Sequence, residues 1–174
     1  MNAPVQQFRT EVEQDLLDLF ELSADALPGD AAVTALRQKA IRTYAAAGLP
    51  HRRVEAWKYT DLRVALKNVP PLLAEVDVQV GESEIGAALG QAFLALPAYR
   101  VVIAAGEFRG DLSDIGALRD AGVEVGSLGQ MLESPPAWLT ASFDETGRRD
   151  DDDVIIALNT ALMTAGVALR LPEG

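Results

Sequence analysis

The spacing of apolar residues changes along the chain, and this change constrains the fold more than any other feature. Up to Gly48 apolar side chains recur three or four residues apart, with acids such as Glu13 between them on the side expected to face water. The pattern predicts two amphipathic helices, over residues 4–22 and from Asp30 to Gly48, that form a helical hairpin. After Pro70 and Pro71 valines alternate with polar residues, which predicts a strand over residues 76–80.

The remainder of the chain carries only short elements. Strands are expected at 100–105, 107–112, 122–126 and 167–171, the first two as a hairpin, with helices over 127–133, from Ser134 through Trp138, and from 154 to Gly166. The acidic run at 150–153 is interpreted as a solvated loop that complements the amino terminus of the last helix, since the ligand pattern of a calcium loop is missing. We therefore expect an α+β chain: a helical hairpin (1–50), a connector (51–70) and a small mixed lobe of short strands and helices (71–174).

Composition excludes several classes of function. With a net charge of -11 over 174 residues, the chain lacks the basic face that nucleic acid or an anionic membrane requires. It contains no cysteine and one histidine, so we expect no metal site, no resident cofactor and no iron–sulfur ligand set. No apolar run is long enough to span a membrane and no secretion signal is present, which makes a cytoplasmic protein the expectation.

Residues 48–63 concentrate the chemistry that the rest of the chain lacks. This segment, GLPHRRVEAWKYTDLR, holds the histidine, one of two tryptophans and one of three tyrosines. Its arginines are expected to pair with Glu55 or to stack on Trp57. One interpretation is a structural clasp in which the aromatic side chains pin a loop onto the helices; the other is a docking surface, because Trp, Tyr and Arg are enriched at interface hot spots. Catalysis by His51 lacks a nucleophile and an orienting carboxylate at a convincing spacing.

The pattern GLP-x-RR-x-E-x-WKYT-x-L within this segment resembles the amino-terminal motif of the SufD family, which are scaffold-type subunits of a bacterial iron–sulfur cluster assembly machine. Three later stretches, at 99–108, 123–128 and 157–169, resemble the segments that follow in the same order in that family. The residues that match the motif one by one, as a structural or docking element, are Arg52, Arg53, Glu55, Trp57, Lys58, Tyr59 and Thr60. Val54 departs from it, because relatives often carry an acid there.

The resemblance implies that this is the amino-terminal region of a longer scaffold that continues into a right-handed parallel β-helix, largely absent from this chain. It implies partners as well: a homologous β-helix subunit and an ABC-type ATPase, both engaged through that remainder. No catalytic, cofactor or metal residue is carried over, so a non-enzymatic role is expected.

Two other functions remain open on the sequence. The chain could act as a stand-alone interaction module that docks through residues 52–59. It could also be a small hydrolase that uses Asp144 and Glu145 or the acids at 150–153, although runs of adjacent acids rarely have the split pKa values that acid–base catalysis needs.

Overall fold

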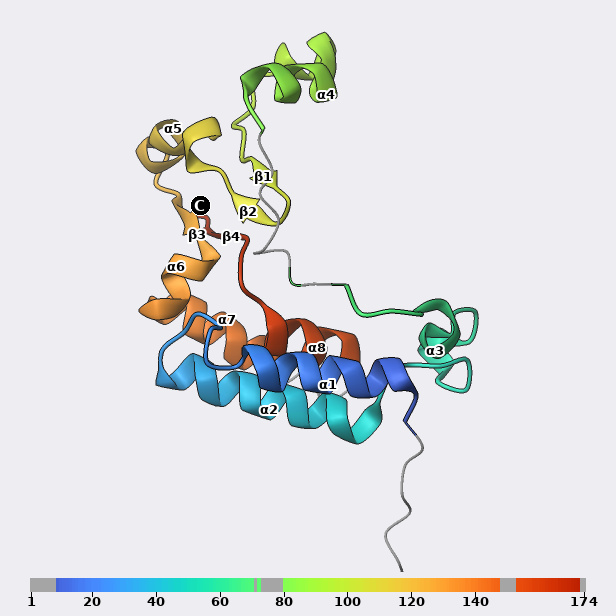
Figure 1. The fold of residues 1–174 in the computed structure, drawn as a ribbon. Coiled ribbons are helices and arrows are strands. Elements are labelled where there is room, and N and C mark those ends of the chain that lie inside the picture. Colours follow the sequence, from blue (N-terminus) through green and yellow to red (C-terminus); the bar gives the residue numbers. More distant parts are fainter. Residues whose placement is uncertain (1–8, 71, 73–79, 148–152, 173–174) are drawn as a thin grey trace, which may run out of the picture. The chain divides into compact units, whose positions relative to one another are not determined.

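The computed structural model describes residues 9–70, 72, 80–147 and 153–172. These form two compact units (Figure 1). The first, called the helical unit, lies within Met1–Leu27, Ala31–Pro70 and Ala141–Met163; the second, called the mixed unit, lies within Pro28–Asp30, Pro71–Thr140 and Thr164–Gly174. The division differs from the expected one, because residues 141–163 belong with the helices of the amino-terminal part and not with the mixed lobe.

The core of the helical unit lies among three helices that run side by side in Figure 1: α1 (Glu11–Ser23), α2 (Ala31–Ala47) and α8 (Val154–Leu162). The expected pair of helices is present, and residues 4–8 of the first prediction lie outside the described residues. The third helix was not expected here. It packs along α2, and the buried Arg37 of α2 donates a hydrogen bond of 3.0 Å from Nη1 to the carbonyl of Ala161 in α8. The helical hairpin therefore has a partner from far along the sequence.

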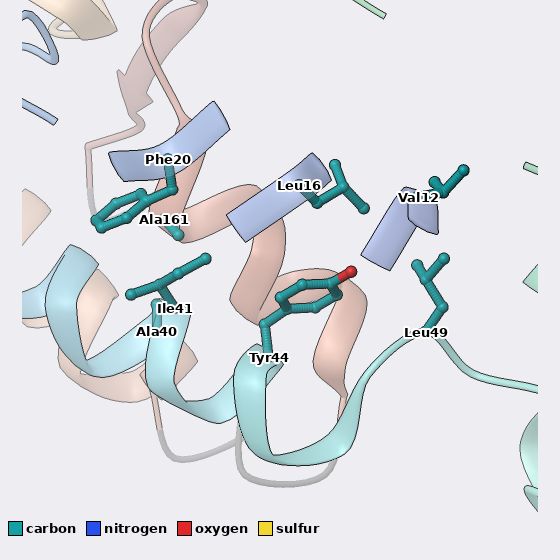
Figure 2. Packing of buried hydrophobic residues seen from close by; sticks show 8 residues of the cluster. All are labelled: Val12, Leu16, Phe20, Ala40, Ile41, Tyr44, Leu49 and Ala161. Carbon is teal, nitrogen blue, oxygen red and sulfur yellow. The ribbon is translucent and has the colours of Figure 1, made fainter. Parts of the chain in front are cut away.

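The core of the helical unit gathers side chains from all three helices and from the residue after Gly48. Figure 2 shows the buried cluster, which consists of Val12, Leu16, Phe20, Ala40, Ile41, Tyr44, Leu49 and Ala161. Two short elements follow α2, a 3-10 helix at Glu55–Trp57 and the single-turn α3 (Leu62–Ala65). Leu62 of α3 packs against the same cluster. The chain thus leaves the core at Leu49 and returns to it at Leu62.

The end of α2 is fixed by glycine geometry. Gly48 has φ +70, and its N–H donates to the carbonyl of Tyr44 at 2.7 Å. A left-handed residue directly after a helix is the common C-terminal stop, and glycine adopts it without a Cβ penalty. The predicted end of the second helix is confirmed.

Two small antiparallel sheets characterise the mixed unit. One is the predicted hairpin, shortened to β1 (Ile103–Ala104) and β2 (Glu107–Phe108), because the second expected strand gives way to a 3-10 helix at Gly110–Leu112. The other sheet pairs β3 (Glu124–Ser127) with β4 (Val167–Arg170), so that Val125 lies opposite Leu169. The unit also contains α4 (Glu82–Leu94), the 3-10 helix (Gly110–Leu112), α5 (Ile115–Asp120), α6 (Leu128–Glu133) and the start of α7 (Ala137–Gly147). Two buried clusters form its core: one of Ile85, Val102 and Leu112, the other of Leu118, Val123 and Val125.

Several expectations for this region fail or lie outside the structure. Helix α4 (Glu82–Leu94) and α5 have no counterpart among the predicted elements, and α7 continues well past Trp138. The last helix ends at Leu162, before Gly166, because Met163 adopts an extended backbone (φ -59, ψ 128). The predicted strand at 76–80 falls almost entirely outside the described residues.

Candidate functional site

The candidate site is the loop between the two core residues Leu49 and Leu62. The N–H of Leu62 donates to the carbonyl of Pro50 at 3.0 Å, which closes the loop at its base. Inside it, Val54 donates to His51, Trp57 to Val54 and Thr60 to Trp57, each at 2.8 Å. A loop whose ends meet and whose backbone bonds to itself has the character of an Ω-loop, a kind that is often functional. Residues 50–62 are called the motif loop below.

All the side chains of the resemblance motif lie on this loop, and most of them face solvent. Exposed are Arg52, Arg53, Glu55, Lys58, Tyr59 and Thr60, whereas Trp57 is half-buried. Tyr59 is 91% exposed. An aromatic side chain that pins a loop has to be covered, so Tyr59 contributes nothing to the structural clasp considered from the sequence. Only Trp57 remains a candidate for that role.

The charges of the loop pair differently from the sequence expectation. Arg52 Nε lies 3.4 Å from Oδ2 of Asp61, and Lys58 Nζ lies 3.3 Å from Oε1 of Glu55. Lys58 also lies over the ring of Tyr59, 5.2 Å from its centre. Neither arginine pairs with Glu55 or stacks on Trp57. Within the described part of the chain the guanidinium of Arg53 has no ion pair or hydrogen bond, while its backbone N–H donates to His51 Nδ1 at 3.3 Å.

The loop is anchored by a buried carboxylate that the sequence pattern predicted to face water. Glu13 of α1 is 1% exposed. Its Oε1 accepts the backbone N–H of Leu49 at 2.7 Å and Nε of Arg63 at 2.9 Å. Its Oε2 accepts both the N–H (2.7 Å) and the hydroxyl (3.0 Å) of Thr10, whose hydroxyl in turn caps α1. One side chain therefore joins the start of α1 to both ends of the motif loop.

The environment of Glu13 keeps it ionised. Burial alone would raise the pKa of its carboxyl group, but the hydrogen bonds from Thr10 and Leu49 and the positive charge of Arg63 together hold that pKa below its usual value. The negative charge of Glu13 also acts on Tyr44, whose hydroxyl donates a 3.5 Å hydrogen bond to the Glu13 carbonyl oxygen. Burial, with the negative charge of Glu13 second, raises the pKa of Tyr44 well above its usual value.

The sequence contained a signal for this anchor. Thr10 and Glu13 fit the S/T-x-x-E capping box, in which the glutamate side chain returns to the N-cap residue. That signal predicts a helix start at Thr10 and marks Glu13 as a bonded residue. It does not predict the bonds to Leu49 and Arg63, which require the tertiary fold.

A pocket with a volume of about 180 Å³ adjoins the motif loop within the helical unit. Its lining comes from the end of α2, the loop and the start of α8: Thr43, Ala47, Gly48, Leu49, Pro50, His51, Val54, Ala56, Trp57, Asp153 and Val154. Asp153 is the N-cap of α8, and its Oδ1 accepts the N–H groups of Ile155 (3.0 Å) and Ile156 (3.4 Å). This confirms the helix-capping interpretation for that residue; residues 150–152 lie outside the structure described here. The pocket wall is mostly apolar.

His51 Nδ1 accepts a backbone N–H, and no group of three His, Cys, Asp or Glu that could hold a metal ion occurs among the residues the structure describes. Within the same residues, no helix is long and apolar enough to cross a membrane. What the loop offers chemically is cations, an exposed phenol and an apolar pocket.

One of three comparisons with known proteins found a match. A family model described as the SufBD protein N-terminal region matches residues 10–174. No curated protein and no solved structure matches the chain.

Proposed function

The chain belongs to the family of the SufBD protein N-terminal region, and from this premise we propose that it is a non-catalytic amino-terminal domain of a scaffold subunit in iron–sulfur cluster assembly. The observation that carries the proposal is the extent of the family match, residues 10–174, which includes both units and the motif loop.

Within this family we propose the SufD type, for which the support is the match of the RR-x-E-x-WKYT pattern at residues 52–60. The intact scaffold would add a right-handed parallel β-helix to the helices and short strands described above. Its partners would be a homologous β-helix subunit and an ABC-type ATPase, in the cytoplasm. The β-helix and the partners are supported by the resemblance of residues 52–60 to the family motif.

A non-enzymatic role without a cofactor in this chain is supported by its residue inventory. Cysteine is absent from all 174 residues and His51 is the one histidine, whereas cluster ligands are overwhelmingly cysteine thiolates with occasional histidine. Any cluster built by the assembly would have to be held elsewhere in it.

The test is co-purification of the full-length protein from its own cells. We expect an affinity-tagged copy to bring down a homologous subunit and an ABC-type ATPase in fixed proportion, and an untagged strain treated in parallel to bring down neither. Recovery of the tagged protein alone, under conditions in which both other subunits are expressed, would contradict the proposal.

A second candidate function is supported by the exposure of the motif side chains. A loop that presents Arg53 and Tyr59 to solvent suits a protein-interaction module, because exposed arginine and tyrosine supply contact area at interface hot spots. This docking role is compatible with a scaffold and does not depend on the ATPase.

A further inference from the structure

The motif loop and the adjoining pocket place the exposed Arg53 on the same loop as residues that form an apolar pocket wall. We propose that they bind an extended acidic segment of a partner protein, with one apolar side chain of that segment inserted in the pocket beside Trp57. The inference rests on the docking role given above and adds the chemistry of the partner.

Charge complementarity is the first argument. Between residues 50 and 62 the chain carries three cations, Arg52, Arg53 and Lys58, against two acids, Glu55 and Asp61, although its overall charge is -11. Arg52 and Lys58 are already matched by acids of the loop, at 3.4 and 3.3 Å. Arg53 is the cation that no described side chain neutralises. Since exposed charges are screened beyond about 8 Å at physiological salt, an acidic partner has to meet this loop directly.

The second argument is the rigidity of the surface. The motif loop is closed at its base by the Leu62 to Pro50 hydrogen bond and held by Glu13 through Leu49 and Arg63. Tyr59 is 91% exposed on this frame. A tyrosine has only two side-chain torsions, so it contributes contact area at a small entropic cost. A preorganised loop loses little freedom on binding.

The size of the pocket decides what can enter it. Its volume is about 180 Å³, below the range of roughly 300–1,000 Å³ typical of small-molecule sites. The apolar lining from Pro50, Val54 and Trp57 suits a single aliphatic or aromatic side chain. Asp153 also lines the pocket, and its negative charge would repel an acid there, so the acids of the partner are expected to lie beside Arg53.

Other macromolecules fit the surface less well. A chain with a net charge of -11 repels nucleic acid and anionic membranes, and a single loop is a small counterweight. A second copy of this chain could contact Arg53 through three exposed acids of α1: Glu11, Asp15 and Asp18. The test below treats self-association as an opposing outcome.

The probe is a synthetic peptide in which one phenylalanine is flanked on both sides by aspartate and glutamate. Trp138→Phe removes the second tryptophan, so that emission reports Trp57, which lines the pocket. We expect saturable binding that shifts this emission and weakens with salt. Arg53→Glu should weaken it by about tenfold or more, because like charges then meet. Arg119→Glu is the matched control, since Arg119 is exposed in the mixed unit and the change in net charge is the same.

Three results would overturn the inference. The first is equal loss of affinity for Arg53→Glu and Arg119→Glu, which would reduce the effect to net charge. The second is unchanged affinity when serine replaces the phenylalanine of the peptide, which would leave the pocket unused. The third is a dimer in sedimentation that Arg53→Glu dissociates, which would make a second copy the occupant. The co-purification experiment has its own readout, so either proposal can fail alone.

Discussion

Removal of the Glu13 carboxylate is the sharpest perturbation of the helical unit. Glu13→Ala takes away the acceptor for the Leu49 N–H and the return half of the capping box, and it leaves Arg63 without its carboxylate. Leu49 is 1% exposed, so water cannot reach its N–H without a rearrangement. The variant therefore uncouples the motif loop from α1.

The expected loss of stability follows from these contacts. A buried N–H without a partner costs about 1–3 kcal/mol. Loss of the hydrogen bonds that Thr10 donates to the Glu13 side chain costs roughly 0.5–1.5 kcal/mol more. The side chain of Arg63 is 32% exposed and can turn to water, so its contribution is small. The sum is about 1.5–4.5 kcal/mol, which is a large part of the roughly 5–15 kcal/mol that stabilises a typical domain.

Urea denaturation followed by far-ultraviolet circular dichroism measures this loss through the helices. Asp15→Asn is the control, because Asp15 is an exposed acid of the same helix and its loss should change stability by less than about 0.5 kcal/mol. If Glu13→Ala were no more destabilising than Asp15→Asn, the carboxylate would not be the anchor described here.

The same side chain predicts a dependence on pH. Its pKa is lower in the folded chain than in the unfolded one, so its contribution to stability is present above the unfolded value of about 4.3 and is lost as pH falls through the folded value. Stability should therefore decline in that acid range. The decline should be shallower in Glu13→Gln.

Three further substitutions test separate parts of the structure. Gly48→Ala should destabilise the chain by about 1–3 kcal/mol, because φ is +70 and a Cβ would lie 2.5 Å from Oε1 of Glu13. The control Gly116→Ala, which places a Cβ in open space, should be neutral or slightly stabilising in the same denaturation experiments. Asp153→Ala should cost about 0.5–2 kcal/mol through the lost cap of α8, and an unchanged urea midpoint would contradict the capping geometry. Tyr59→Ala should leave the melting temperature unchanged because the side chain is 91% exposed, while Trp57→Ala should lower it; equal effects would restore the clasp interpretation for both.

Local patterns predicted the elements whose signals are local. The three- and four-residue spacing predicted α1 and α2, Gly48 marked the end of α2, and the two neighbouring strand patterns predicted the hairpin of β1 and β2. Each depends on residues close together in the chain. The loop that carries the resemblance motif was located for the same reason.

Features that depend on long-range contacts were not predicted from the sequence. The acid–apolar alternation of α1 suggested that Glu13 faces water, but the fold brings Leu49 and Arg63 to it and buries it. Helix α8 looked like part of a carboxy-terminal lobe, yet it packs on α2 through residues such as Ala161. Helix α4 was missed because its glycines and alanines leave a weak helical pattern, and Gly90 has φ +73 within it.

The central claim is that this chain supplies a docking domain to a cluster-assembly scaffold and holds no cluster itself. The most direct measurement is anaerobic reconstitution of the purified chain with ferrous iron and sulfide, followed by desalting and assays of iron and acid-labile sulfide, with a cysteine-ligated ferredoxin as the positive control. The account predicts that the ferredoxin keeps its cluster while this chain elutes without stoichiometric iron or sulfide. Retention of both by this chain, with the visible absorption of an iron–sulfur cluster, would contradict it.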